Sequence, residues 1–259
     1  MNDTSSSESS FSKYSRKDLR QYDQLRKVTI TPHVVDHAEG SVLIAFGNTR
    51  VLCTASVESK PPPWLFGTGQ GWVTAEYGML PRSTNQRIKR EKALNGGRSQ
   101  EISRLIGRSL RACVDLKLLG EKQIIIDCDV LNADGGTRTA SITGGYIALA
   151  LALNKMKQAG DIKSLPLKSY VAAISVGLDL GTPLLDLNYE EDSKIHTDMN
   201  FVLNNKLQLI EIQGTAEGTP FSEQQLSQML HIAKKGCLEL FEQQASFVKD
   251  FFPLELAPL

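Results

Sequence analysis

Short runs in which apolar and polar residues alternate, or in which β-branched residues gather, recur along the chain and are typical of β-strands. Two of these runs, 41–46 and 50–57, flank a Gly-Asn-Thr tripeptide that begins at Gly47, and this turn chemistry predicts a β-hairpin. The predicted strands are 28–31, 41–46, 50–57, 123–130, 170–178, 184–187, 200–203 and 207–213.

Three segments instead carry apolar residues at the spacing of an α-helix. The first, about 100–118, has one apolar face and arginines on the other face. The second, about 139–157, is apolar almost all round, so we expect it at the centre of the protein, and Gly144 within it indicates close approach to a neighbouring element. The third begins at the Ser-Glu-Gln-Gln capping box that starts at Ser222 and continues through Leu240.

Strands in consecutive runs, with the helices grouped between them, predict an α+β fold with mostly antiparallel or mixed sheets against a few long helices. Residues 1–24 are rich in Ser, Lys, Arg and Gln and poor in apolar residues, so we expect a flexible N-terminal tail. The remaining chain predicts a single domain over 25–246 and a C-terminal extension over 247–259.

Composition narrows the function classes. The 259 residues include 29 Lys and Arg against 29 Asp and Glu, which excludes a uniformly basic nucleic-acid-binding protein. Four cysteines stand singly among apolar residues and predict buried thiols. The N-terminus has no apolar signal-peptide core, and the longest apolar run, 147–153, is too short to cross a bilayer. We therefore expect a cytoplasmic protein with no membrane partner.

Charge is nevertheless distributed unevenly along the chain. From Arg82 to Arg111 there are nine basic residues and two acidic ones. Such a cluster attracts a polyanion, because each neutralised phosphate releases condensed counterions. The alternative is a solvated helix face beside a charged loop, and charge alone leaves both interpretations open.

An acidic segment, 186–198, has the opposite sign. Its carboxylate oxygens are the ligands that Mg²⁺ or Mn²⁺ prefers. Asp192 and Asp198 are six residues apart, which is roughly 20 Å in a continuous strand. They can share one metal only if the chain between them turns back, and an acidic surface loop is the alternative.

A Gly-Gly turn lies before the second predicted helix, in the segment from Ala133 to Ser141. Free N–H groups at a helix start, the positive end of the helix dipole, and the side chains of Thr137, Arg138 and Ser141 together favour an anion site. The spacing is not that of a Walker A loop. A plain loop with an N-capping threonine is the alternative.

Several longer strings accompany this turn: Asp-His-Ala-Glu-Gly-Ser from Asp36, Val-Leu-Cys-Thr-Ala-Ser from Val51, Thr-Ala-Glu-Tyr-Gly-Met-Leu-Pro-Arg-Ser-Thr from Thr74, Thr-Asp-Met-Asn from Thr197 and Ile-Gln-Gly-Thr-Ala-Glu-Gly from Ile212. Together they closely resemble the ribonuclease PH family of phosphate-dependent exoribonucleases. The resemblance extends from about residue 20 to residue 241. It implies a ribonuclease PH-like α+β fold and a catalytic role for the domain predicted over 25–246.

The resemblance also implies a role for individual residues. The family's phosphate site corresponds to Arg98, Gly136, Thr137 and Arg138. Its paired catalytic aspartates, which would also be the ligands of Mg²⁺ or Mn²⁺, correspond to Asp192 and Asp198. Its tRNA-contacting arginines correspond to Arg82, Arg87 and Arg90.

The implied reaction is phosphorolytic 3′→5′ trimming of tRNA precursors and other RNA 3′ ends. Inorganic phosphate is the co-substrate, nucleoside diphosphates are released, and the reverse reaction adds nucleotides. The implied assembly is a homohexamer built as a trimer of dimers. Three alternatives stay open: a catalytically inactive RNA-binding ring subunit, a hydrolytic two-metal nuclease, and a non-enzymatic RNA-binding module.

Overall fold

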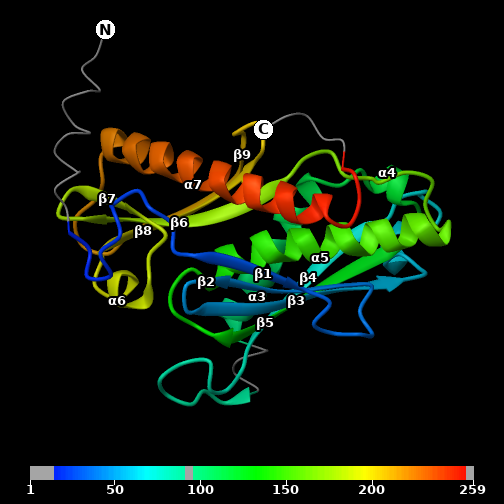
Figure 1. The fold of residues 1–259 in the computed structure, drawn as a ribbon, viewed down its shortest axis with the longest axis horizontal. Helices are drawn as coiled ribbons and strands as arrows, with labels where there is room; N and C mark the ends of the chain where they lie inside the picture. The colour runs from blue at the N-terminus through cyan, green and yellow to red at the C-terminus, as the bar shows by residue number, and fades with distance from the viewer. Residues whose placement is uncertain (1–14, 91–95, 255–259) are drawn as a thin grey trace, which may run out of the picture.

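The computed structural model describes residues 15–90 and 96–254 and arranges them in two β-sheets with helices packed against them (Figure 1). The first sheet has the strand order β1-β2-β3-β5-β4, and the second has the order β7-β6-β8-β9. The strands are β1 (Val28–Pro32), β2 (Gly40–Phe46), β3 (Thr49–Glu58), β4 (Trp72–Met79), β5 (Gln123–Asn132), β6 (Val171–Asp179), β7 (Thr182–Leu185), β8 (Thr197–Asn204) and β9 (Leu209–Ala216). The helices are η1 (Pro63–Leu65), α3 (Gly97–Ala112), α4 (Leu116–Leu119), α5 (Thr137–Ala159), α6 (Tyr189–Asp192) and α7 (Glu223–Lys249).

Pairing in the first sheet is mixed. β2 and β3 form the predicted hairpin, with Phe46 paired to Thr49 across the turn. β3 pairs with β5 in the antiparallel sense, whereas β4 pairs with β5 in the parallel sense. All pairings in the second sheet are antiparallel. The predicted α+β fold with antiparallel and mixed sheets is therefore confirmed.

Strand β4 is an element that the sequence pattern left unassigned. Val73, Ala75 and Tyr77 are buried and alternate with more exposed residues. Alanine, glutamate and glycine have low β propensity, so the local signal in this run is weak. Its hydrogen bonds to β5 extend along the whole strand, and this long-range pairing determines the conformation.

Helix α5 lies between the first sheet and α7 (Figure 1), and residues 139–153 are all buried. This confirms the central position expected for the second predicted helix. Its glycines let the sheet approach the helix closely. A Cβ atom on Gly144 would lie 2.6 Å from Cγ2 of Ile44 and 2.9 Å from Sγ of Cys53. The four cysteines are buried free thiols, as predicted.

The first predicted helix, about 100–118, is two helices in the structure. α3 ends at Ala112, and a separate turn of helix, α4, follows. The side chain of Asp115 accepts hydrogen bonds from the N–H groups of Lys117 and Leu118, which is the geometry of an N-cap. An N-cap residue has non-helical backbone angles, so the capping interaction at Asp115 separates the two helices.

The N-terminal segment differs from the predicted tail. Residues 1–14 lie outside the described residues, but residues 15–24 run along the protein, and Arg16 is buried. Its guanidinium group donates to the Leu185 carbonyl at 2.7 Å and pairs with Glu191. A segment of low hydrophobicity stays disordered when its polar groups find no partners in the folded protein. Here buried acceptors bind the Arg16 side chain, so this part of the segment is ordered.

The predicted C-terminal extension also begins inside the fold. α7 continues through Lys249, and Val248 and Phe252 are buried in the hydrophobic core, whereas residues 255–259 lie outside the described residues. The core is one continuous cluster that includes side chains from both sheets and from α3, α5 and α7. None of the helices in 15–90 and 96–254 is long and apolar enough to span a membrane.

We predict that Gly144→Ala lowers the free energy of unfolding by about 1–3 kcal/mol, because the added methyl group overpacks the contact between α5 and β2. Urea denaturation followed by circular dichroism measures the change. Gly97→Ala is the matched control, since among the described residues beyond its own turn of helix no atom lies within 4 Å of its added Cβ. Equal stability of the two variants would contradict the close approach of helix and sheet.

Candidate functional site

Two consecutive glycines shape the loop between β5 and α5. Gly135 and Gly136 have φ angles of +76° and +64°, a region that side chains other than glycine rarely adopt. A Cβ atom on Gly135 would lie 2.3 Å from the Leu187 carbonyl oxygen. The loop can therefore pass directly against the segment that precedes α6 only because residue 135 is glycine.

The loop ends at the N-terminus of α5. Gly136 is the N-cap, and it has no side chain that could accept a hydrogen bond from the first N–H groups of the helix. These N–H groups form the positive end of the helix dipole. An anion placed there meets free donors. Ser141, predicted at this site from the sequence, lies elsewhere: it is fully buried, and its hydroxyl group donates to the Thr137 carbonyl at 2.8 Å.

Two arginines and two hydroxyl groups surround this helix start. Arg138 belongs to the first turn of α5, and its Nη1 donates to Oε1 of Gln213 on β9 at 3.0 Å. The hydroxyl groups of Thr137 and Tyr77 are 2.8 Å apart. Burial raises the pKa of Tyr77, while the charges of Arg98 and Arg138 lower it, so both guanidinium groups act on the same ring.

Tyr77 and Gln213 are contacts that sequence reasoning missed. Both belong to strings that carry the family resemblance, but neither was assigned a role. The alternation of buried residues along β4 is the signal that indicates the inward direction of Tyr77. Gln213 gives no comparable signal, because only the pairing of β9 with β8 brings it to the site.

The structure places Asp198 close enough to Asp192 for its charge to act on the Asp192 carboxyl group. Asp192 is the last residue of α6, and the N–H groups of Lys194 and Ile195 both donate to the Glu191 carbonyl, so the chain turns back before β8. Partial burial of the carboxyl group raises the pKa of Asp192, and the charge of Asp198 raises it further.

Three arginines also act on Asp192: one in α3, one in α5 and one just before β1. The charges of Arg98, Arg138 and Arg26 act on Asp192 in the opposite direction to Asp198 and lower its pKa. The same two arginines that influence Tyr77 thus also influence the acidic pair. The predicted phosphate site, which includes the start of α5, and the predicted aspartates therefore form one constellation, in which the charges of Arg98 and Arg138 act on Asp192.

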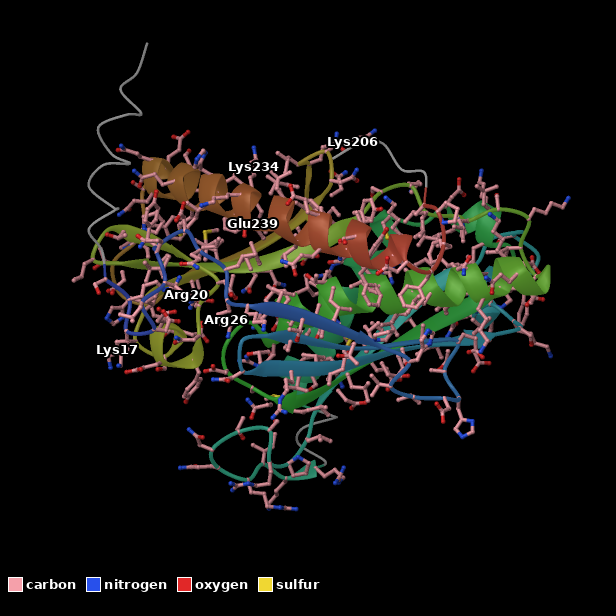
Figure 2. The ribbon with its side chains drawn as sticks, in the orientation of Figure 1. Lys17, Arg20, Arg26, Lys206, Lys234 and Glu239 are labelled. Carbon is pink, nitrogen blue, oxygen red and sulfur yellow. The ribbon has the colours of Figure 1, made fainter. Side chains whose placement is uncertain are left out.

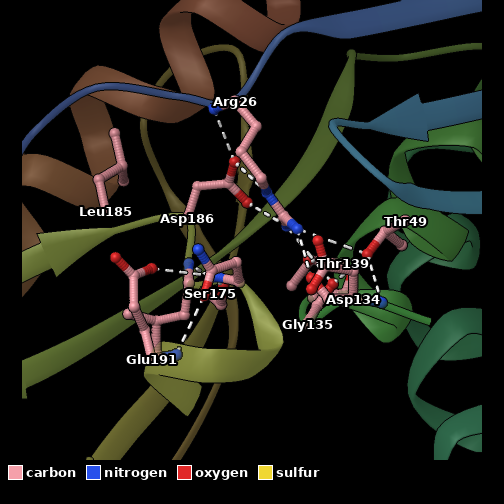
Figure 3. Close-up of polar contacts among 12 residues, drawn as sticks. Arg26, Thr49, Asp134, Gly135, Thr139, Ser175, Leu185, Asp186 and Glu191 are labelled. Atoms are coloured by element: carbon pink, nitrogen blue, oxygen red, sulfur yellow. Dashed lines mark hydrogen bonds and ion pairs between the residues drawn. The ribbon is translucent and has the colours of Figure 1, made fainter. Parts of the chain in front are cut away.

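A buried ion pair supports the glycine loop (Figure 3). Arg26 directs its Nε and Nη2 to the two carboxylate oxygens of Asp186, at 3.0 and 2.7 Å, and Asp186 is fully buried. The same guanidinium group donates to the carbonyl groups of Asp134 and Gly135. Thr49 donates its hydroxyl hydrogen to the Gly135 carbonyl at 2.6 Å and accepts from the Asp134 N–H at 3.0 Å.

A second layer of arginines reaches α6. Arg16 and Arg20 both donate to the Asp186 carbonyl and both pair with Glu191. Glu191 also completes the capping box of α6 with Asn188. Arg20 and Arg26 lie along the N-terminal segment beside α6 (Figure 2). This segment therefore positions the helix that ends at Asp192.

The three predicted RNA-contacting arginines lie outside this constellation, in the loop after β4. Arg82, Arg87 and Arg90 are all exposed. Arg82 contributes to the wall of a cavity beside the glycine loop. The predicted loop continues into residues 91–95, which lie outside the described residues.

A divalent cation fits the chemistry of the aspartate pair. Among the described residues, no group of three or more His, Cys, Asp or Glu side chains could hold a metal. Mg²⁺ commonly takes only one or two carboxylates, with substrate phosphates and water as its other ligands. Asp192 and Asp198 repel each other, and a cation between them would relieve this repulsion.

Known families match most of the chain. The model described as "3′ exoribonuclease family, domain 1" matches residues 24–153, and "3′ exoribonuclease family, domain 2" matches residues 169–236. The chain belongs to the 3′ exoribonuclease family. The predicted resemblance is thereby confirmed.

Two curated relatives of this family member carry the name Ribonuclease PH. The protein from Bdellovibrio bacteriovorus is 65% identical over 239 residues, covering 92% of this chain and 98% of the relative. The protein from Cereibacter sphaeroides is 58% identical over 227 residues, covering 87% of this chain and 96% of the relative.

Solved structures share the fold of this family member. A chain of the Archaeoglobus fulgidus exosome with RNA bound to the active site matches with a TM-score of 0.76 at 22% identity, covering 88% of this chain and 92% of that one. A chain of an archaeal exosome core matches with a TM-score of 0.71 at 24% identity, covering 89% and 91%. At these identities the likeness shows the fold alone.

We predict that Asp186→Asn lowers the free energy of unfolding by about 3–5 kcal/mol, because it leaves the buried Arg26 guanidinium group without its counter-charge. Asparagine tolerates the φ of +54° at this position, so backbone strain should not contribute to the change in the free energy of unfolding. Chemical denaturation measures the change. Glu190→Gln, which neutralises a carboxylate in an exposed ion pair with Lys194, should leave stability unchanged.

Proposed function

We propose that this protein is a phosphorolytic 3′→5′ exoribonuclease, in the nucleotidyltransferase class, that trims the 3′ ends of tRNA precursors and other RNAs. The observation that carries the proposal is the start of α5, where Gly136 leaves the first N–H groups uncapped and the charge of Arg138 acts, together with that of Asp198, on Asp192. The high identity to two proteins named Ribonuclease PH supports the same activity.

Inorganic phosphate is the co-substrate in this proposal. Gly136 and Thr137 offer donors at the helix start, and Arg98 and Arg138 supply positive charge. An oxygen of the bound phosphate forms a bond to the phosphorus of the last phosphodiester. The bond from that phosphorus to the 3′ oxygen of the preceding nucleotide breaks, and the oxygen takes up a proton. A nucleoside diphosphate leaves, and in reverse the same steps add a nucleotide.

The difficulty in this reaction is that two anions must approach each other. Arginine forks offset the repulsion and orient both phosphates, so catalysis depends mainly on positioning and charge. Tyr77 fixes the orientation of the Thr137 hydroxyl group, and Gln213 fixes Arg138. These contacts hold the donors in place before substrate arrives.

We further propose that Asp192 and Asp198 hold Mg²⁺, or Mn²⁺, at this site. The ion would supply Lewis-acid stabilisation of charge on the scissile phosphate. In this proposal the two carboxylates are the catalytic aspartates. Their position on α6 and β8 is fixed by the turn that follows Glu191.

RNA is the polyanionic partner in this proposal. Arg82, Arg87 and Arg90 project from the loop after β4 and would contact the backbone of tRNA precursors. Such phosphate contacts position the substrate and make its binding dependent on salt.

We propose a homohexamer, built as a trimer of dimers, as the working assembly. The solved chains of like fold come from structures of an exosome with bound RNA and of an exosome core. The two family domains share one continuous hydrophobic core, which supports their action as one catalytic unit. Four buried free thiols fit a reducing compartment, and we propose the cytoplasm.

The three alternative functions require different subsets of these residues. A catalytically inactive ring subunit needs neither the aspartates nor the phosphate-site residues, but this chain carries the residues proposed for both roles. A hydrolytic two-metal nuclease needs no phosphate site and releases nucleoside monophosphates. A non-enzymatic RNA-binding module would bind RNA equally well with Asp192 and Asp198 changed to Asn.

We predict that the protein, incubated with Mg²⁺ and a tRNA that carries extra 3′ nucleotides, releases nucleoside diphosphates only when inorganic phosphate is present. Chelation of the metal should stop the reaction, because without the cation the negative aspartates face the negative phosphates of the substrate directly. Chromatography of the nucleotides measures the products. Monophosphates released without phosphate would identify a hydrolase instead.

We predict that Arg138→Ala lowers kcat/KM for phosphate by about 100-fold or more, because one preorganised charge donor at the reacting group is lost. Initial rates at subsaturating phosphate measure the effect. Lys157→Ala removes an exposed cation from the opposite end of α5 and should behave as wild type. Near-normal phosphorolysis by Arg138→Ala would refute the phosphate-site assignment.

A further inference from the structure

A polar cavity of about 790 Å³ lies beside the glycine loop, outside the constellation described above. Its wall is formed by the β2–β3 turn, the loop after β4, the end of β5 and the first residue of α6. In Figure 1 that loop projects at the lower edge of the molecule, and α6 lies on the left above it. The volume is within the range of pockets that bind small organic ligands.

One hydroxyl group in the wall has no hydrogen-bond partner among the described residues. Ser83 is 2% exposed, and its Oγ forms no hydrogen bond within the described structure. Its backbone is fully used, since its N–H donates to Leu80 at 2.9 Å and its carbonyl accepts from Ala133 at 2.8 Å. A buried hydroxyl group without a partner is costly, so its retention in a cavity wall points to a ligand that satisfies it.

The charge of the cavity favours an anion. Arg50 and Arg82 both contribute to the wall, both are exposed, and neither forms an ion pair with any residue in 15–90 or 96–254. Among the described residues of the wall, Asp134 is the one carboxylate, and its Oδ1 accepts the backbone N–H of Tyr189. Two guanidinium groups against one carboxylate leave a net positive charge for a phosphate group.

Tyr189 connects the cavity to the proposed catalytic aspartates. The residue is 56% exposed, contributes to the wall, and is the first residue of α6, the short helix that ends at Asp192. Residues three apart on a helix are about 5–6 Å apart, so the cavity begins one helical turn from that carboxylate. An exposed aromatic ring held by its backbone is a surface on which a nucleobase stacks.

We propose that this cavity binds a nucleotide unit of the RNA strand upstream of the scissile bond. Arg50 and Arg82 bind its phosphate, the Tyr189 ring stacks on its base, and the Ser83 hydroxyl group donates to a phosphate or ribose oxygen. The inference rests on the proposed exoribonuclease function and adds a substrate subsite to it. A free nucleoside diphosphate has the same phosphate and base, so the test must separate the two sources.

The experiment measures KM in both directions of the reaction for wild type, Tyr189→Ala, Tyr189→Phe and Arg50→Ala. Phosphorolysis is titrated with an oligoadenylate and with phosphate, and the reverse reaction with a primer and with ADP. We expect Tyr189→Ala to raise the KM for oligoadenylate and primer by roughly tenfold, within the range of one lost stacking contact. The KM for phosphate and for ADP should not change.

The remaining variants make the result specific. Tyr189→Phe keeps the ring and should restore the wild-type KM for RNA, whereas a defect in the fold of α6 would not be rescued in this way. Arg50→Ala should raise the KM for RNA and weaken its dependence on salt. Lys157→Ala is the control for the loss of an exposed cation.

Each outcome has one meaning. If the KM for ADP rises and the KM for primer does not, the cavity is a product site and the inference is wrong. If Tyr189→Ala leaves the KM for RNA unchanged, the cavity is not on the path of the strand. If wild type itself forms no diphosphates with phosphate, the proposed function fails, and that result is separate from any difference between variants.

Discussion

The buried ion pair between Arg26 and Asp186 is the interaction on which the rest of the site depends. Its guanidinium group joins three segments that are distant in the sequence: the entry to β1, the Asp134–Gly135 loop, and the segment before α6. Burial by itself lowers the pKa of Arg26, but the charge of Asp186 and the hydrogen bonds to it outweigh burial and raise the pKa. The pair therefore stays charged and fixes the loop before α5 against the segment before α6.

A buried ion pair is weak evidence of stability, because desolvation of two charges offsets much of their attraction. Its value here lies in geometry. A carboxylate with two acceptor oxygens and a planar guanidinium group fix direction as well as distance. The glycines of the loop complete this arrangement, since Gly135 passes so close to the Leu187 carbonyl that no side chain fits. Rigid placement suits a reaction that depends on positioning two phosphates.

The balanced net charge of the chain hides two local fields of opposite sign. Both fields act on Asp192: the charge of Asp198 raises its pKa, and the charges of Arg98 and Arg138 lower it. The sequence correctly indicates an uneven distribution of charge, but not that the two fields meet. Arg108, part of the same basic stretch, is neutralised locally by Glu211 at 2.6 Å. A count along the sequence therefore overstates the positive charge available to a substrate.

The sequence by itself determined the fold class, the hairpin at Gly47, the central apolar helix and the family, because periodicity and local motifs are properties of neighbouring residues. The tertiary structure decided the rest. β4 needs its partner β5, the N-terminal segment needs buried acceptors on α6, and Tyr77 reaches Thr137 only across two elements. Asp192 and Asp198 meet because the chain turns back between them. Each of these depends on contacts between residues far apart in the chain, and local propensity carries no information about such contacts.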